Sequence, residues 1–165
     1  MNVRPRALGD LEELVEVAAR VRKIDGYPVY LRDNDFRLFL TRPIPLDAWV
    51  AEANGHVVGH VALNSQTHPA AMAVVREAGF SGEVGVVARL LVDPVARRQG
   101  LGTRLLERAQ AEAVEQGRVP VLDVLASAAT AINLYLARGW QQLGRCEFEI
   151  PGHGLVEEII FAAPC

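Results

Sequence analysis

The chain has 165 residues, of which 50% are hydrophobic and 22% charged, a balance typical of globular proteins and too apolar for intrinsic disorder. Its 17 Lys and Arg residues face 20 Asp and Glu residues, and the net charge of -3 argues against a surface that coats nucleic acid. For this length, one domain over residues 1–165 is the simplest expectation.

No apolar run approaches the roughly 18 residues that a membrane-spanning helix requires. The first residues also lack the apolar segment of a secretion signal, so we expect a cytoplasmic protein without a membrane partner. Cys146 and Cys165 have no metal-ligand spacing, and this favours reduced thiols over a disulfide and predicts no metal site.

The first third of the chain predicts a short strand around Val3-Arg4 and then an amphipathic helix. Asp10 is placed to cap this helix, with Glu13 completing a capping box. A short helix is predicted over residues 35–40, between prolines. Asn54-Gly55 separates the apolar runs 47–53 and 56–65, which predicts a type I′ hairpin.

The rest of the chain predicts further strands and helices in alternation. A helix over 70–78 lies within the segment 66–82, and an apolar strand over 86–92 precedes a helix that ends near Gly117. A buried strand over 119–125, a helix capped by Ser127 and a hairpin of strands 140–150 and 155–162 follow. The order predicts an α/β (α+β) fold whose mixed, mostly antiparallel sheet has one βαβ crossover and helices on both faces.

The turn between the strand over 86–92 and the following helix has the composition of a phosphate-binding loop. Glycines at the mouth of a helix let backbone N–H groups converge on an anion, here at Gly100 and Gly102. Arg97 and Arg98 stand where the helix dipole ordinarily favours acidic side chains, which indicates that a bound anion completes the site.

A Rossmann-type dinucleotide site is the main alternative, because Asp123 follows the glycines at about the spacing of a ribose-binding acid. Leu105 occupies the position of the third glycine, and little chain follows for a second nucleotide-binding half. A purely structural glycine turn is the other alternative, and the pattern favours the phosphate loop over both.

The run Arg97-x-x-Gly100-x-Gly102 resembles the acyl-CoA pyrophosphate loop of the GNAT acyltransferase superfamily. The run Ala131-Ile132-x-Leu134-Tyr135-x-x-x-Gly139-Trp140 resembles the family's second signature, at the expected distance. The resemblance implies the GNAT fold and transfer of acetyl from acetyl-CoA to a primary amine of a small-molecule or peptide acceptor, by direct attack in a ternary complex. It implies no metal and leaves a homodimer open.

The resemblance also implies roles for residues. In the family, backbone N–H groups of the loop hold the pyrophosphate, the strand before it pairs with the pantetheine arm, and the signature tyrosine protonates the thiolate. The cofactor-binding residues expected here are Leu90, Leu91, Val92, Arg97, Arg98, Gln99, Gly100, Leu101, Gly102, Thr103, Asn133 and Tyr135. Ala128 replaces an asparagine that many relatives use on CoA, and Asn133 lies on a different face of the same helix.

Catalytic roles are less determined by the sequence. Tyr135 is the candidate acid, although an amphipathic tyrosine can equally pack its ring in the core. Asp123 and Glu83 are candidate bases, and a water-relayed base is an alternative. His60 is a further candidate, although a lone histidine on a strand is more often structural.

The acceptor cannot be identified from the sequence. Tyr27, Tyr30, Asp33, Asp35 and an insertion over 66–82 that leans over the cleft are expected to shape its site, and the acids could attract a cationic amine. A CoA-binding sensor without turnover is the alternative from another functional class.

Overall fold

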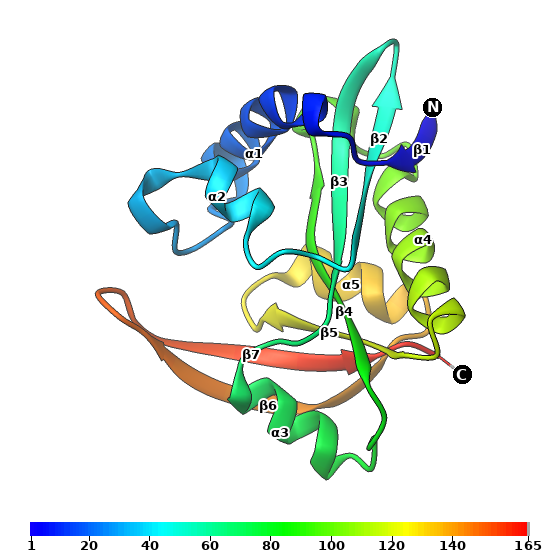
Figure 1. Ribbon diagram of the computed structural model, residues 1–165. Coiled ribbons are helices and arrows are strands. Elements are labelled where there is room, and N and C mark those ends of the chain that lie inside the picture. The colour runs from blue at the N-terminus through cyan, green and yellow to red at the C-terminus, as the bar shows by residue number, and fades with distance from the viewer. Residues whose placement is uncertain (165) are drawn as a thin grey trace. The chain divides into compact units, whose positions relative to one another are not determined.

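The computed structural model describes residues 1–164, and Figure 1 shows its strands and helices in chain order. The strands are β1 (Asn2–Pro5), β2 (Asp47–Ala53), β3 (His56–Asn64), β4 (Val84–Val92), β5 (Val119–Leu125), β6 (Gln141–Ile150) and β7 (Gly154–Ala162). The helices are α1 (Leu11–Asp25), α2 (Phe36–Thr41), α3 (Pro69–Glu77), α4 (Leu101–Glu115) and α5 (Ala129–Ala137), with short 3-10 turns η1 (Leu8–Asp10), η2 (Arg32–Asn34) and η3 (Pro94–Ala96). Cys165 lies outside the described residues. Among those described, no helix combines the length and apolarity that crossing a membrane requires.

The strands form one mixed sheet in the order β1-β2-β3-β4-β5-β7-β6. β4 and β5 are parallel over Val84–Val86 and Val119–Val121, and α4 forms the crossover between them. The pairs β1-β2, β2-β3, β5-β7 and β6-β7 are antiparallel. The mixed sheet with a βαβ crossover that the sequence predicts is confirmed.

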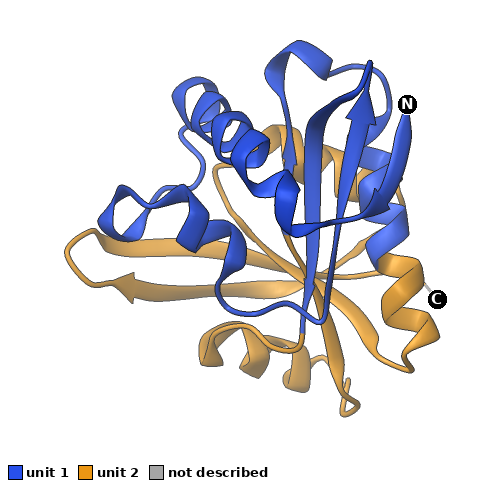
Figure 2. Ribbon diagram, turned by 45° about the horizontal axis from the view of Figure 1, so that its top comes forward, with its two compact units in different colours: residues 1–64, 89–109 blue, residues 65–88, 110–165 orange. Residues whose placement is uncertain are grey.

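The chain divides into two compact units, coloured separately in Figure 2. The first unit comprises residues 1–64 and 89–109, and the second comprises residues 65–88 and the chain from Gln110 onward. β4 and α4 each contribute to both units, so the division does not follow a single linker. One domain over residues 1–165 stays a prediction.

Helices cover both faces of the sheet within the first unit. Leu14, Val17 and Ala18 of α1 are fully buried in a core cluster with Val50 and Val57. On the opposite face of β2, Trp49 lies under the guanidinium of Arg108 on α4, at 5.0 Å from the ring centroid.

Gly59 on β3 permits the close approach of α4. A Cβ there would lie 3.0 Å from Leu105 Cδ1 and 3.1 Å from the carbonyl oxygen of Leu91. Both distances are shorter than ordinary van der Waals contacts, so a side chain at Gly59 would force the Leu105 side chain and the backbone at Leu91 to shift by a few tenths of an ångström.

The second unit also carries helices on both faces. Ala71 and Val75 of α3 are buried in a cluster with Val86, Val121 and Ile160. Tyr135 of α5 contacts Phe161, the next residue along β7 and therefore on the opposite face. The helix of the 66–82 segment packs its apolar stripe into the core of this unit, and a role of the segment at the acceptor site stays a prediction.

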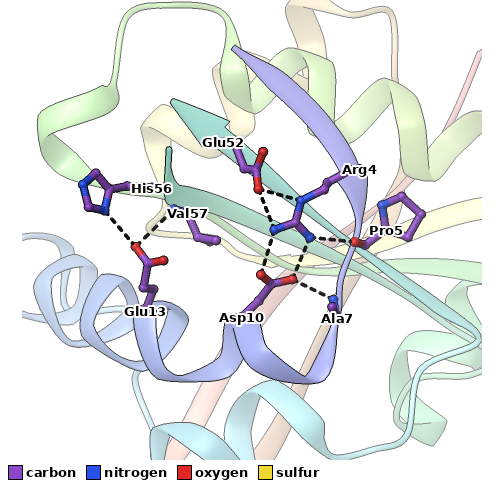
Figure 3. A network of polar contacts seen from close by, with 8 residues as sticks. All are labelled: Arg4, Pro5, Ala7, Asp10, Glu13, Glu52, His56 and Val57. Carbon is purple, nitrogen blue, oxygen red and sulfur yellow. Dashed lines mark hydrogen bonds and ion pairs between the residues drawn. The ribbon is translucent and has the colours of Figure 1, made fainter. Parts of the chain in front are cut away.

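Asp10 does not cap α1 as the sequence predicted. Its carboxylate accepts two hydrogen bonds of 2.8 Å from the Arg4 guanidinium and one of 2.6 Å from the N–H of Ala7 (Figure 3). Glu13 accepts a hydrogen bond from the N–H of Val57 instead of closing a capping box. The tertiary partner outcompetes the local one because a paired guanidinium binds a carboxylate more strongly than a neutral N–H does.

Other local predictions have mixed outcomes. The Asn54-Gly55 hairpin is confirmed, since both residues have positive φ, 54° and 78°, as a type I′ turn requires. Helix α2 follows Asp35, whose carboxylate accepts from the N–H of Leu38. The prediction that Ser127 caps α5 is wrong, because Ala128 holds that position without a side-chain hydrogen bond.

We expect Asp10→Ala to lower the free energy of unfolding by about 2–4 kcal/mol, because it leaves the Arg4 guanidinium without its bidentate partner in a part-buried site. Glu52→Ala is the matched control: Glu52 lies 2.6 Å from the same guanidinium but is about one-third exposed, so the loss should stay below about 1 kcal/mol. Urea unfolding measures both, and equal losses would contradict this ranking.

Candidate active site

The loop between β4 and α4 begins at a buried aspartate. Asp93 is 3% exposed, and its carboxylate accepts hydrogen bonds from Arg20 Nη2 at 2.6 Å and from the N–H of Val95 at 3.2 Å. Its own N–H donates to the carbonyl of Val58 on β3. These bonds fix the point where the strand ends and the loop begins.

Arg97 holds the loop from within. Its Nε donates to the carbonyl of Val92 at 3.1 Å, and its Nη2 lies 2.6 Å from the carboxylate of Asp25 at the end of α1. The guanidinium is therefore committed to protein partners. Any contribution of Arg97 to a bound phosphate is left to its backbone.

The start of α4 presents free backbone donors. The first hydrogen bond of the helix runs from the N–H of Arg104 to the carbonyl of Gly100, at 3.1 Å. The N–H groups of Leu101, Gly102 and Thr103 therefore have no acceptor within the helix.

The backbone just before the helix is left-handed at two positions. Arg98 and Gly100 have φ of 64° and 77°, and successive turns of this kind form concavities that bind anions. Nothing lies within 4 Å of a Cβ built at Gly100, and Arg98, Gln99 and Gly100 are exposed. Leu101 is buried, so it offers only its backbone.

The β4 residues predicted to contact the pantetheine arm lie past the stretch in which β4 pairs with β5. β4 pairs with β5 from Val84 to Val86, whereas Leu90, Leu91 and Val92 form its far end. Leu91 is buried in the core of the first unit, and Leu90 and Val92 are partly buried.

Tyr135 lies in the second unit, where it is 7% exposed. Its ring centroid is 6.2 Å from that of Trp140 and 5.9 Å from that of Phe161. These contacts hold the Tyr135 ring in the core, which agrees with the structural role that the sequence offered as the alternative to a catalytic acid. Asn133 on the same helix is exposed.

Asp123 belongs to a polar cluster in the second unit that the sequence did not reveal. Thr67 Oγ1 donates to Asp123 Oδ1 at 3.0 Å, and His68 Nε2 lies 2.6 Å from Glu158 Oε1 and 4.0 Å from Asp123 Oδ2. His68, Glu158 and Cys146 place one polar atom each within 4.8 Å of one another. Glu158 faces inward with Ile160 because both lie at the same parity on β7.

The cluster shares protons. His68 Nδ1 accepts from the N–H of Ala71, so Nε2 carries the proton and donates to Glu158. Burial, together with the neighbouring carboxylate of Asp123, raises the pKa of Glu158 to about 8. Burial and the same two carboxylates raise the pKa of the Cys146 thiol to about 11.

The other two candidate bases lie in unsuitable surroundings. The Glu83 side chain, directly before β4, is 78% exposed and forms an ion pair of 3.2 Å with Arg118. His60 is fully buried between Arg6 Nη1, at 3.0 Å, and the carbonyl of Arg89, at 2.8 Å. Burial lowers the pKa of His60 to about 4, so the ring stays neutral and has a structural role.

Only some of the expected acceptor-site residues come together. A cavity of about 530 Å³ in the first unit is lined by Tyr30, Leu31, Arg32, Asp35, Leu38, Phe39, Arg42, Pro43 and Arg89. Tyr27 packs edge-on against Phe39, and Asp33 lies exposed in η2. Arg89 was missed, although an arginine within the apolar run of β4 was a visible signal.

We expect the ionisation of Glu158 to cost stability as pH rises. Its pKa in the fold lies above its ordinary value of 4.5, so its contribution is complete below about pH 4.5 and is lost as pH rises through about 8. Glu158→Gln cannot ionise. Its melting temperature relative to wild type should therefore rise by at least about 3 °C between pH 5 and pH 9, equivalent to ~1 kcal/mol.

Glu157→Gln, on the exposed face of the same strand, is the control and should show no such trend. A pH-independent difference between Glu158→Gln and wild type would contradict the assignment of a shared proton.

Comparisons with known proteins agree with this fold. A search of the curated proteins finds no match. Among solved structures, the chain is similar to a ribosomal-protein-alanine N-acetyltransferase from Brucella melitensis, with 18% identity, a TM-score of 0.69 and 100% of both chains covered. It is also similar to the ribosomal-protein-S18-alanine N-acetyltransferase from Escherichia coli, with 21% identity, a TM-score of 0.69, and 99% of this chain and 92% of that one covered. NAA60 of Arabidopsis thaliana in complex with acetyl-CoA matches with 18% identity, a TM-score of 0.70, and 98% and 96% covered.

The sequence model described as "Acetyltransferase (GNAT) family" matches residues 11–140, which include both the glycine loop and the Tyr135 signature. The chain therefore belongs to the GNAT acetyltransferase family.

Proposed function

We propose that the protein is an acetyl-CoA-dependent N-acetyltransferase that moves the acetyl group to a primary amine within a ternary complex. The observation that carries the proposal is the start of α4, where three N–H groups without helix partners follow the left-handed Arg98 and Gly100 in a member of this family. This arrangement suits a diphosphate. A fold neighbour was solved with acetyl-CoA bound.

The proposed reaction needs two proton transfers. The amine nitrogen attacks the thioester carbonyl, the carbon–sulfur bond breaks, the amine loses a proton and the departing thiolate gains one. A phenol can donate to a thiolate because its ordinary pKa lies above that of a thiol. Tyr135 is proposed for this step from its place in the family signature.

The Asp123–Glu158 pair is proposed as the acceptor of the amine proton. A carboxyl group with a pKa of about 8 is well matched to general-base work near neutral pH. Thr67 and His68 orient the pair by donating hydrogen bonds to it. Glu83 is not proposed for this role, because its carboxylate is exposed and paired with Arg118.

Thiol release on mixing the protein with acetyl-CoA and a panel of primary amines tests the proposal. Release that depends on the amine supports an enzyme. Calorimetric binding of CoA without amine-dependent release would support the sensor alternative instead. The Rossmann alternative is wrong, since the chain belongs to the GNAT family.

Gly100→Glu should weaken CoA binding by at least about 100-fold, because it adds a carboxylate beside the N–H groups proposed to hold the pyrophosphate. Gly117→Glu is a matched control: both glycines have similar positive φ, 77° and 70°, and open space around a built Cβ, but Gly117 lies past the other end of α4. Calorimetry with CoA measures both. Equal affinities of the two variants for CoA would contradict the proposal that this loop binds the pyrophosphate.

Tyr135→Phe should lower kcat by about 10²-fold or more, the usual effect of losing a general acid, and leave the Kd for CoA within about twofold. The ring contacts to Trp140 and Phe161 survive in the variant. An undiminished kcat would show that another group protonates the thiolate.

A further inference from the structure

The cavity of the first unit has an unbalanced charge. Its lining carries the guanidinium groups of Arg32, Arg42 and Arg89 against the carboxylate of Asp35, and Arg32 also lies 4.0 Å from the carboxylate of Asp33 outside the lining. Its remaining walls are mainly apolar or aromatic: Leu31, Leu38, Phe39, Pro43 and Tyr30. A ligand that fits this lining combines an apolar body with a negatively charged group.

Arg89 is held in this lining by a strained backbone. Its φ is 55°, a left-handed conformation that costs a non-glycine residue about 1–2 kcal/mol. The buried ring of His60 compensates for the strain. Since Arg6 Nη1 can only donate, His60 Nε2 accepts, and the protonated Nδ1 donates to the carbonyl of Arg89 at 2.8 Å.

The side chain of Arg89 is positioned but not neutralised. Its Nε donates to the carbonyl of Phe39 at 3.1 Å and its Nη2 to the carbonyl of Arg42 at 3.4 Å. The guanidinium carbon also lies 4.2 Å from the centroid of the Phe39 ring. All these partners are uncharged, so none of them compensates the guanidinium, and an anion is the partner that such a group favours.

We propose that this cavity binds the carboxylate of the acceptor, and that the acceptor is a small amino acid with an apolar side chain. The inference rests on the proposed N-acetyltransferase function. Arg89 and Arg42 pair with the carboxylate, and Leu31, Leu38 and Phe39 contact the apolar side chain. A volume of about 530 Å³ suits a small molecule. The carboxylate of Asp35 repels a dianion more than a monoanion, which favours a carboxylate over phosphate.

The binding part of the proposal is tested without turnover. Calorimetry compares 4-methylpentanoate with 4-methylpentanamide, which has the same apolar body but no charge. The carboxylate should bind at least about tenfold more tightly, as a charged hydrogen-bonded pair predicts. Inorganic phosphate at equal concentration should not displace it. Equal binding of the two probes, no binding, or displacement by phosphate would overturn the proposal.

Three variants localise the effect. Arg42→Gln should reduce the affinity for 4-methylpentanoate about tenfold and leave that for the amide within about twofold. Arg37→Gln, on helix α2 five residues before Arg42 and outside the cavity lining, is the matched control and should change neither. Arg89→Lys keeps the charge but loses the paired donors, and should fall between wild type and Arg42→Gln. Wild-type affinity in Arg42→Gln and Arg89→Lys would overturn the assignment.

Turnover separates this proposal from the proposed function. With acetyl-CoA, leucine should release thiol at least about tenfold faster, in kcat/KM, than leucinamide, and Arg42→Gln should abolish this preference. Thiol release that favours leucinamide would overturn the carboxylate proposal while supporting an N-acetyltransferase. Selective binding of 4-methylpentanoate with no thiol release from any amine would overturn the proposed function and leave the carboxylate site supported.

Discussion

The shape of the glycine loop, residues 93–100 between β4 and α4, depends on two ion pairs that join it to α1. Arg20 binds the buried carboxylate of Asp93 where β4 ends, and Asp25 binds Arg97 just before the glycines. Each pair is reinforced by a hydrogen bond with nearby backbone. The N–H of Val95 donates to the Asp93 carboxylate, and Arg97 Nε donates to the carbonyl of Val92. The free N–H groups at the start of α4 are thus held in place before any ligand arrives. Preorganised donors of this kind bind an anion without a further ordering cost.

Arg89 is likewise held in place by a hydrogen bond to its backbone. A left-handed arginine inside a strand is unfavourable by itself, and it persists because a buried neutral histidine holds its carbonyl. His60 was expected to have a structural role, and its role is to stabilise the backbone of a cavity residue. In the second unit, by contrast, the polar cluster keeps its charge adjustable, because two carboxyl groups share protons next to His68.

Local signals in the sequence predicted most of the fold. The Asn-Gly turn, the apolar strand before the glycine loop and the glycine that ends α4 each act within a few residues, so their structures could be inferred without tertiary contacts. The prediction for Asp10 failed because Arg4 of β1 binds its carboxylate, and the prediction for Ser127 failed because Ala128 occupies the cap position. The polar cluster could not be predicted, because His68 and Glu158 are 90 residues apart and meet only through strand pairing and the packing of α3. The arginine lining of the cavity likewise depends on α2 meeting β4, where Arg89 donates to the carbonyl of Phe39.

The burial of His60 gives the first unit its own response to acid. The pKa of the His60 ring is about 4 in the folded protein and 6.5 in the unfolded chain. Between these pH values the unfolded chain binds a proton at His60 and the folded protein does not. The linked loss reaches up to about 3 kcal/mol as the pH falls from 6.5 to 4. Over the same range the second unit becomes more stable, because Glu158 is held in its neutral form. Mild acidification therefore lowers the contribution of His60 to the stability of the first unit while it raises that of Glu158 to the second.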